Sequence, residues 1–321
     1  MSERSAPAAF GVAVASLAAG AYPGVTSVLV TQDGEVRCEW YDTAGGAATL
    51  RNTRSVTKTL TGLLVGIAVA RGSIRSVDDP VARYVEGAAL DETLGTPTIE
   101  ELLTMSSCLD CDDAVPASPG NEDKLHDSGD WHRFAREIPL RQPCGPRSFR
   151  YCTAGTVLLA AAVEAATATP IDELAAASVF RPLGIAAWRW FTDGDGRAFP
   201  GGGLELATRS LAALGGLYAG TAPRGRDVVD PSWLERSAAP SVAATGPYAY
   251  GYLLWLRDYE VDGRVVHARC MLGNGGNKVL ALPDERAVVV VTATNYNRPG
   301  MHELTDRLVE ALLVPGLAAG A

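Results

Sequence analysis

The spacing of hydrophobic residues along the chain predicts several helices with buried faces. From Leu60 to Ala70, leucines and other apolar residues recur at helical spacing, so one face of this segment is predicted to enter the core. Residues 8–21 are apolar and rich in small side chains, and we interpret them as the first helix. The later predicted helices are 157–165, 171–177, 209–219 and 302–313.

Alternating apolar and polar residues predict strands near the start and near the end of the chain. Thr26 to Thr31 is β-branched and alternating, Asp33-Gly34 is typical of a type I′ turn, and Val36 to Tyr41 returns as a second strand. Towards the C-terminus further strand-like runs follow one another. These predicted strands are 248–256, 265–272, 279–282 and 287–294.

Length and composition indicate a globular protein with a large core. The 321 residues are 47% hydrophobic, which is enough for one large domain or two intergrown lobes. The net charge is −9 and no Lys/Arg-rich run is present, which argues against a nucleic acid or an anionic membrane as partner. No apolar run is long enough to span a bilayer. We therefore expect a small-molecule partner, no nucleic acid and no membrane.

The N-terminal segment and the cysteines bear on location. Residues 8–21 also fit a signal peptide, but Glu3 precedes them and no clear cleavage site separates them from the next strand. Six cysteines (38, 108, 111, 144, 152 and 270) are scattered along the chain, which favours free thiols in a reducing compartment. Cys108 and Cys111 have the spacing of half a zinc site, but no second ligand pair follows, so no metal is expected. The predicted localisation is cytoplasmic.

The most informative short motif is Ser55-Val56-Thr57-Lys58, at the start of the apolar helix. Residues three positions apart share a helix face, so the Ser55 hydroxyl and the Lys58 amine can act as nucleophile and base. Taken alone, the motif is more typical of a capped helix start with a solvated lysine, and two later stretches favour the catalytic interpretation. If Lys58 is buried near the helix N-terminus, its pKa should lie below the ordinary value of about 10.4, as a general base requires.

Two further stretches complete a candidate site. Tyr151 stands just before a predicted helix and is followed by the hydroxyl residue Thr153, which would place a phenol and a hydrogen-bonding group at a cleft; an ordinary packed aromatic is the alternative. The glycine-rich run 273–278 would let backbone N–H groups approach a ligand, as an oxyanion hole requires, although a simple hairpin loop has the same composition. The run 201–203 is interpreted as a tight turn, because no phosphate-binding motif surrounds it.

The segment 106–147 has few periodic apolar residues and is predicted to be a long irregular loop. Such loops in compact proteins are often lids or binding loops. The carboxylates from Asp110 to Asp113, with Trp131 and Phe134, would give a lid both negative charge and an apolar wall. A solvated loop far from the site is the alternative.

Taken in order, these stretches make the chain resemble the serine β-lactamase and penicillin-binding-protein superfamily, in particular its class C-like branch of esterases, nylon-oligomer amidases and transacylases. Ser55-Val56-Thr57-Lys58 matches the family's Ser-x-x-Lys, Tyr151-Cys152-Thr153 resembles its Tyr-x-Asn/Ser element, and Asn274-Gly275-Gly276 stands where it has Lys-Thr-Gly or His-x-Gly. The resemblance extends from about Tyr22 to the last helix. Thr153 departs from the asparagine of penicillinases, and Asn274 departs from a lysine that helps to bind a β-lactam carboxylate. Without that lysine, a neutral or cationic substrate is expected.

The resemblance implies an α/β fold: a β-lactamase-like antiparallel sheet flanked by helices, with an inserted, mainly α-helical lobe. Within a single domain over 1–321, the α/β lobe would comprise about 1–71 plus 246–321, and the helical lobe about 72–245. The resemblance also implies that Ser55 attacks the substrate carbonyl, Lys58 accepts or holds its proton and Tyr151 passes a proton to the leaving group. Substrate and oxyanion would be bound without metal or cofactor, by Thr153, Asn274, Gly275, Gly276 and Asn277.

Several functions fit these motifs. The first hypothesis is a serine hydrolase that cleaves a small ester or amide through an acyl-enzyme on Ser55. The main alternative is a transacylase of small-molecule biosynthesis, because an amine or alcohol can resolve the same acyl-enzyme. A β-lactamase or D-Ala peptidase, and a non-catalytic ligand-binding homologue, are less favoured.

Overall fold

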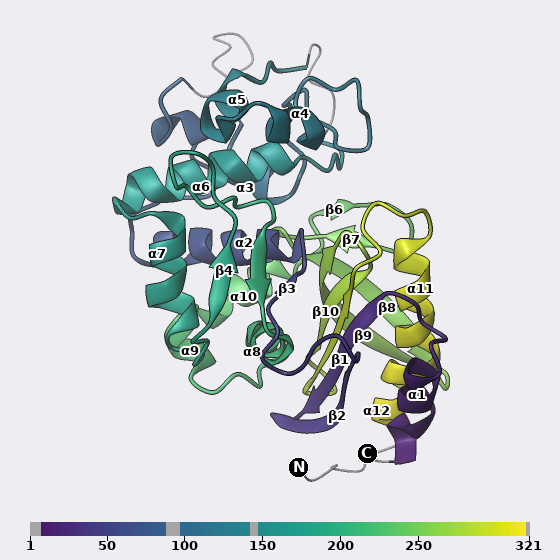
Figure 1. The fold of residues 1–321 in the computed structure, drawn as a ribbon. Helices are drawn as coiled ribbons and strands as arrows, with labels where there is room; N and C mark the ends of the chain where they lie inside the picture. The colour runs from purple at the N-terminus through teal and green to yellow at the C-terminus, as the bar shows by residue number, and fades with distance from the viewer. Residues whose placement is uncertain (1–7, 88–96, 142–146, 319–321) are drawn as a thin grey trace.

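One antiparallel sheet of eight strands organises the protein. The computed structural model describes residues 8–87, 97–141 and 147–318. Its large sheet has the strand order β2-β1-β11-β10-β9-β8-β7-β6, so the N-terminal hairpin lies beside the C-terminal strands (Figure 1). The expected fold, an antiparallel sheet flanked by helices, is confirmed. The strands are β1 (Val25–Gln32), β2 (Glu35–Tyr41), β6 (Val242–Ala243), β7 (Ala249–Tyr250), β8 (Trp255–Val261), β9 (Arg264–Gly273), β10 (Asn277–Leu282) and β11 (Ala287–Ala293).

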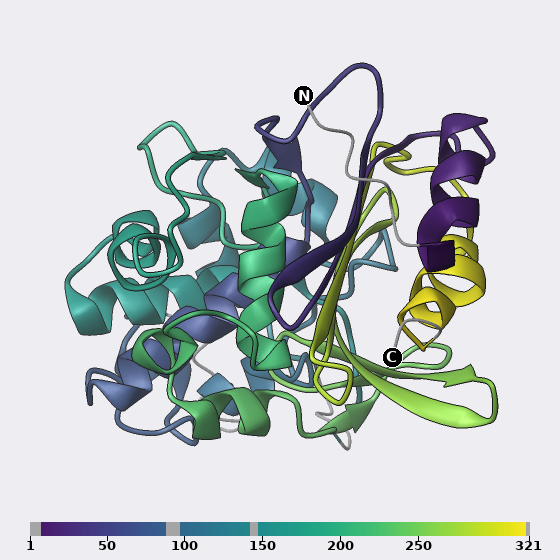
Figure 2. The same cartoon turned by 90° about the horizontal axis from the view of Figure 1, so that it is seen from below.

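Alternating side chains of the central strands enter two separate cores. On β1, Val28 and Val30 enter one buried cluster, whereas Leu29 enters the other. Because successive residues of a strand point to opposite faces, one apolar strand can seal both layers. α1 (Ala8–Ala18), α11 (Met301–Leu308) and α12 (Val314–Ala318) cover one face, and α8 (Thr208–Ala219) packs against β1, β10 and β11 on the other (Figure 2).

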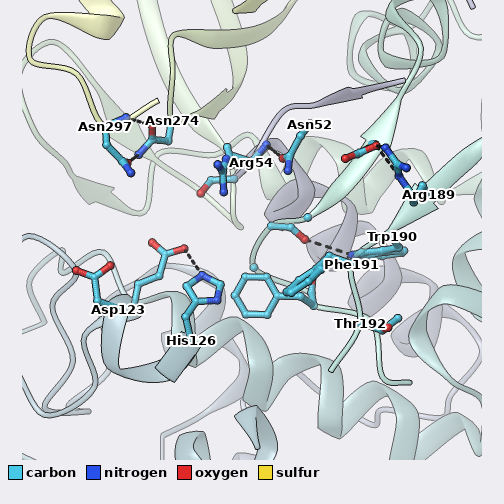
Figure 3. Close-up of a pocket in the computed structure, with 17 residues that line it drawn as sticks. Asn52, Arg54, Asp123, His126, Arg189, Trp190, Phe191, Thr192, Asn274 and Asn297 are labelled. Carbon is cyan, nitrogen blue, oxygen red and sulfur yellow. Dashed lines mark hydrogen bonds and ion pairs between the residues drawn. The ribbon is translucent and has the colours of Figure 1, made fainter. Parts of the chain in front are cut away.

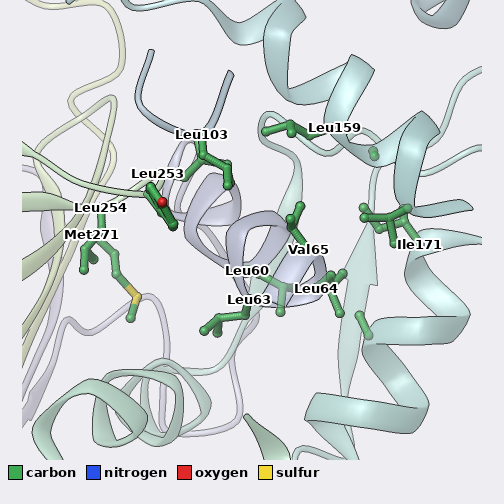
Figure 4. Close-up of a cluster of buried hydrophobic side chains, with 14 of the residues drawn as sticks. Leu60, Leu63, Leu64, Val65, Leu103, Leu159, Ile171, Leu253, Leu254 and Met271 are labelled. Carbon is green, nitrogen blue, oxygen red and sulfur yellow. The ribbon is translucent and has the colours of Figure 1, made fainter. Parts of the chain in front are cut away.

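The helix that begins after Ser55 runs through the centre of the larger core. α2 (Val56–Ala70) buries every residue from Val56 to Ala68. Its leucines pack among Leu103, Leu159 and Leu253 from surrounding segments (Figure 4). The other helices on this side of the sheet are α3 (Ile99–Leu103), α4 (Glu122–Asp127), α5 (Trp131–Glu137), α6 (Thr153–Thr167), α7 (Ile171–Ala175), α9 (Gly225–Val228) and α10 (Pro231–Ser237).

A small second sheet pairs the strand that precedes α2 with two strands from the segment 188–206. Its strand order is β3-β5-β4, with β3 (Arg51–Asn52), β4 (Trp188–Trp190) and β5 (Leu204–Leu206). The lobe limits near residues 71 and 246 stay a prediction; α8, which lies inside the range 72–245, packs on the large sheet.

The segment expected to be irregular contains two short helices. Asn121 and Asp130 begin α4 and α5, and their side chains accept hydrogen bonds from the N–H groups of Asp123 (3.0 Å) and Arg133 (3.0 Å). Each helix buries at most two side chains, so the segment has no visible apolar period. Polar caps, rather than hydrophobic repetition, mark these helices in the sequence.

The expectation of free thiols is wrong for three of the cysteines. Cys111 and Cys152 form a disulfide across 41 positions, and Cys108 is also disulfide-bonded. Cys38 and Cys270 are free and buried, and Cys144 lies outside the described residues. The Cys108-x-x-Cys111 spacing therefore belongs to cross-links rather than to half a zinc site. Disulfides persist mainly in oxidising compartments, so the thiol argument for a cytoplasmic protein is lost.

Within the described ranges, no single helix is both long and apolar enough to cross a bilayer, although α6 and the following helical segment 171–180, which meet at a 76° bend, pass the same test together.

Candidate active site

The Ser55 hydroxyl and the Lys58 amine are in direct contact at the N-terminus of α2. Ser55 is the N-cap residue, and Lys58 Nζ donates hydrogen bonds to Ser55 Oγ (2.9 Å) and to the Gly201 carbonyl (2.6 Å). Lys58 is only 1% exposed, so its ammonium group has protein rather than water around it. The solvated-lysine alternative is excluded.

Hydrogen bonds to the segment 200–204 hold this end of α2 in place. Thr61 Oγ1 donates to the Pro200 carbonyl (3.0 Å), and the Leu204 N–H donates to Thr57 Oγ1 (3.4 Å). The same segment presents the Gly201 carbonyl to Lys58. The glycine run, which the sequence suggested to be only a tight turn, is therefore part of the site.

Tyr151 lies on the other side of Lys58. Lys58 Nζ is 5.0 Å from the centroid of the Tyr151 ring, and that ring stacks on Trp255 with centroids 5.7 Å apart. Burial raises the pKa of the Tyr151 phenol, and the positive charge of Lys58 and a hydrogen bond with Ser55 only partly offset this effect. Tyr151 is therefore a neutral phenol at neutral pH.

The pKa of Lys58 is shifted in the direction opposite to our expectation. Burial by itself lowers this pKa, but the negative charges that Tyr151, Glu122 and Asp113 can carry outweigh it and raise the pKa above its ordinary value. Burial and the helix dipole can be inferred from the sequence, but the two carboxylates come from a distant segment and approach the amine only in the folded chain. In the resting protein Lys58 is an ammonium group.

Asp113 connects the segment 106–147, here called the lid segment, to the residues around Tyr151. Its Oδ2 accepts the Thr153 N–H (2.7 Å), its Oδ1 accepts the Glu122 N–H (2.9 Å), and its own N–H donates to the Tyr151 carbonyl (2.8 Å). Burial raises the pKa of Asp113 to about 6, although Lys58 pulls it down. This carboxyl therefore titrates just below neutral pH.

The predicted Asn274–Asn277 edge reaches the site through Gly273. A Cβ atom at Gly273 would lie 1.9 Å from the Thr53 carbonyl oxygen and 3.3 Å from the Ser55 nitrogen, so only glycine lets β9 come this close. Gly275 and Gly276 have φ angles of +92° and +89°, which form the tight turn. The Gly275 N–H donates to Met301 Sδ (3.1 Å).

The four residues of this edge have different surroundings. Asn274 lines the pocket beside Ser55. Asn277 is buried, and its side-chain amide bonds the Asn274 and Ala293 carbonyls (2.8 and 3.0 Å) and the Ala293 N–H (3.0 Å). The Asn277 side chain therefore braces the strand, and only its backbone can serve a substrate. Thr153 is fully buried, and its methyl group faces Gly201.

A cavity of about 720 Å³ opens in front of Ser55 (Figure 3). Several of the residues that form this cavity were not predicted from the sequence, because each is polar or aromatic and belongs to no motif. Glu122, Asp123 and His126 come from α4, and Arg54 precedes the nucleophile. Among the described residues, no group of three or more His, Cys, Asp or Glu side chains could hold a metal ion.

Aromatic side chains join the lid segment to the cavity wall. Trp131 packs against Phe199 and Phe191, with ring centroids 4.7 and 5.7 Å apart, and His126 lies 4.7 Å from Phe199. Phe191 and Phe199 line the cavity, as do His126 and Glu122. The segment 106–147 thus contributes to the pocket, but through Glu122 and Asp123 rather than through Asp110 and Asp112.

Glu122 is a carboxylate within this wall. Burial raises its pKa, but the nearby His126 and Lys58, with further hydrogen bonding, lower it below the ordinary value. His126 Nε2 lies 3.6 Å from Glu122 Oε1. The α4 side of the pocket therefore carries negative charge at neutral pH.

Comparisons with known proteins support this fold and identify the family. Over 221 residues the chain is 31% identical to the 6-aminohexanoate-dimer hydrolase of Paenarthrobacter ureafaciens, a match that covers 64% of this chain and 55% of that relative. The chain thus spans little more than half the length of this relative.

Solved structures resemble the fold over almost the whole chain. EstCE1, a hydrolase with promiscuous acyltransferase activity, superimposes with a TM-score of 0.75 at 16% identity, covering 94% of this chain and 97% of EstCE1. A penicillin-binding protein from Bacillus halodurans gives a TM-score of 0.69 at 19% identity, covering 91% and 98%. The sequence profile of the Beta-lactamase family matches residues 12–314. The chain therefore belongs to the beta-lactamase family.

Proposed function

We propose that this protein is a serine hydrolase that cleaves a small ester or amide through an acyl-enzyme on Ser55. The observation that carries this proposal is the 2.9 Å contact between Lys58 Nζ and Ser55 Oγ in the wall of an open cavity, with the Tyr151 ring beside the amine. A nucleophile, a proton-transfer group and a second acid within contact of one another are the minimum set for acyl transfer.

The proton inventory of the site defines the acylation step. The resting site holds a Lys58 ammonium and a neutral Tyr151 phenol, so one proton must leave the pair before Ser55 can be activated. Neutral Lys58 then takes the Ser55 proton as Oγ attacks the carbonyl. Tyr151 gives its proton to the departing oxygen or nitrogen and regains one from Lys58. Acylation should therefore accelerate as pH rises above neutrality.

The oxyanion needs two backbone donors. In the described part of the chain no group accepts a hydrogen bond from the Ser55 N–H, which leaves it available for the carbonyl oxygen. The close approach of Gly273 brings the edge 274–277 to the same place, and this edge supplies the second N–H in our proposal.

The α4 wall favours a neutral or cationic group on the substrate. Glu122 is charged at neutral pH and lines the same cavity as Ser55. The matched relative is named for hydrolysis of the 6-aminohexanoate dimer, an amide, and this supports a small amide or ester as substrate here. The same wall favours amine acceptors, which keeps acyl transfer as the second candidate function.

Labelling with a neutral fluorophosphonate, followed by intact mass and peptide mapping, tests the nucleophile without knowledge of the substrate. Wild type should gain one adduct at Ser55, faster at pH 8.5 than at pH 6.5, and Ser55→Ala should gain none. Ser232→Ala, at an exposed serine away from the cavity, is the matched control and should label like wild type. An adduct on another residue, or none in wild type, would refute the proposal.

Hydrolysis and transfer are separated by one acyl donor tested with paired acceptors. Adding an amine or an alcohol of similar size should leave most of the acyl group as free acid if the protein is a hydrolase. If the amine product dominates at millimolar acceptor, the transacylase assignment replaces it.

A further inference from the structure

Phe191 leaves a large apolar surface open to the cavity in front of Ser55. Its side chain lines that cavity and is 56% exposed, although phenyl rings are usually covered in folded proteins. In Figure 3, Trp190 and Phe191 lie on the side of the pocket away from Asp123. Because contact between water and an apolar ring is unfavourable, an apolar group that covers Phe191 gains free energy.

Backbone contacts hold Phe191 in one place. Its N–H donates to the Gly203 carbonyl (3.0 Å), and its carbonyl accepts the Phe199 N–H (2.9 Å). Gly203 has a φ angle of +75°, and a Cβ atom there would lie 2.8 Å from Phe191 Cβ. Only glycine therefore lets the chain pass this close to Phe191. A binding surface that is already fixed loses little entropy when a ligand packs on it.

A layer of buried rings supports Phe191. Trp131 is 4% exposed and packs on Phe191 with ring centroids 5.7 Å apart, and Phe199, which is 2% exposed, packs on Trp131. The protein already covers these two rings, whereas more than half of Phe191 stays open. Phe191 is therefore the part of this aromatic wall with the most surface left for a substrate to cover.

The charged groups of the cavity are either distant from Phe191 or paired. The negative charge of Glu122 belongs to the α4 wall. Arg189 lies two positions before Phe191, but its Nε donates to Glu205 Oε2 (2.8 Å), and the two form a salt bridge. The glycine run 201–203 adds no side chain to this part of the lining. The side of the cavity around Phe191 therefore favours an apolar group over a charged one.

Ring contacts separate Phe191 from the residues around Tyr151. Tyr151 contacts Phe149 and Trp255, with ring centroids 6.3 and 5.7 Å apart. Among the residues that the structure describes, no ring contact joins this group to Phe191 or to the rings that support it. In the proposed mechanism Tyr151 gives its proton to the leaving group, so the leaving group extends towards Tyr151. The acyl part of the substrate then extends towards Phe191.

We propose that the acyl part of the substrate carries a ring-sized apolar group, aromatic or cycloaliphatic, that packs on Phe191. This inference rests on the proposed hydrolase function and makes its substrate class more specific. Aromatic rings that pack in a tilted or offset arrangement gain more than their buried area alone provides, so an aromatic acyl group fits best. Phe191 takes no part in the bond changes and acts only on which acyl group is accepted.

Three esters test where the ring binds. Vinyl phenylacetate has a ring on the acyl part, phenyl acetate has one on the leaving group, and vinyl acetate has none. Acid release is followed with a pH indicator. For wild type, kcat/KM should be higher for vinyl phenylacetate than for vinyl acetate. Phe191→Ala should lower kcat/KM for vinyl phenylacetate about tenfold more than for the other two esters, because a ring contact and its buried area are lost.

Two further variants calibrate this loss. Phe191→Leu retains an apolar side chain without a ring, and its extra loss on vinyl phenylacetate should be only about threefold. Trp188→Ala is the matched control. It removes another exposed aromatic side chain of the same segment, which packs on Phe180 (ring centroids 5.1 Å apart) and does not line the cavity. Trp188→Ala should keep the wild-type ratios among the three esters.

The assignment is wrong if wild type does not prefer vinyl phenylacetate to vinyl acetate, or if Phe191→Ala lowers both vinyl esters equally. An extra loss on phenyl acetate instead would place the ring on the leaving group and would also overturn it. Fluorophosphonate labelling of Phe191→Ala checks that the nucleophile is intact; if labelling is slow, the ratio of the two vinyl esters in Phe191→Leu decides. Failure of wild type to label at all would instead refute the hydrolase function, so the two failures are distinguishable.

Discussion

Breaking the Cys111–Cys152 disulfide should destabilise the protein and slow acylation together. The bond joins the lid segment to the residue between Tyr151 and Thr153. Two hydrogen bonds of Asp113 cross the same junction, to the Tyr151 carbonyl (2.8 Å) and from the Thr153 N–H (2.7 Å). Without the covalent bond, non-covalent contacts such as these two hydrogen bonds and the Arg150–Asp112 ion pair (3.8 Å) would have to hold Tyr151 against the segment 106–147.

The expected loss of stability follows from the length of the closed loop. A disulfide across 41 positions removes enough entropy from the unfolded chain to stabilise the folded state by about 4 kcal/mol on the chain-entropy relation. Cys108 also forms a disulfide, which restricts the unfolded chain further. We therefore expect Cys111→Ala/Cys152→Ala to lower the free energy of unfolding by roughly 2 to 4 kcal/mol.

Urea unfolding measures this loss, and fluorophosphonate labelling measures its effect on the site. The double variant should unfold at lower urea, and its labelling rate should fall because Tyr151 is less well positioned. Wild type in which a reductant has broken the disulfides, as verified by counting the free thiols by mass spectrometry, should behave similarly. The same reductant should change the double variant less. A difference in unfolding free energy below about 0.5 kcal/mol would refute the reasoning.

Two other predictions concern Asp113 and Gly201. Folding raises the pKa of Asp113 from 3.8 to about 6, so the stability that its protonated form contributes should be complete below pH 4 and lost as pH rises through 6. Between pH 4 and pH 7 the free energy of unfolding should therefore fall by up to about 3 kcal/mol more in wild type than in Asp113→Asn. Parallel curves for the two proteins would contradict this prediction. Gly201→Ala would place a Cβ atom 2.4 Å from Thr153 Cγ2 and should shift the carbonyl that binds Lys58, which should slow fluorophosphonate labelling about tenfold or more. Gly202→Ala is the control, because its Cβ atom would have no contact closer than 3.5 Å, and it should label almost normally. Equal labelling rates of the two variants would exclude this role for Gly201.

The sequence was most informative where residue spacing itself determines geometry. Ser55 and Lys58 share a helix face at any helix start, and the Asp33-Gly34 turn has both residues at positive φ, +51° and +81°, as a type I′ turn requires. Most strands of the large sheet were predicted, but β6 was missed, and the single predicted strand 248–256 corresponds to β7 and only the start of β8. The order of the motifs along the chain then indicated the fold.

The missed features all depend on contacts between distant segments. Glu122 acts on Lys58 across 64 positions of chain, and Gly201 binds it across 143. No local pattern marks either residue, because a carboxylate at a helix start and a glycine in a turn are common for other reasons. The disulfides were missed for a similar reason: the positions of the cysteines along the chain do not show which sulfur atoms meet.

The error over the pKa of Lys58 changes how the site is expected to work. A lysine that is only buried would lose its proton near neutral pH and act as a base at rest. The structure instead places Tyr151, Glu122 and Asp113 near a buried amine, and the negative charges that these groups can carry favour the ammonium form, from which Ser55 Oγ accepts a hydrogen bond. A serine held in this way is poorly activated until the pair of Lys58 and Tyr151 loses a proton. The lid carboxylates should therefore restrain acylation in the empty site, and a substrate that shields Lys58 from them would lower its pKa and favour the reactive form.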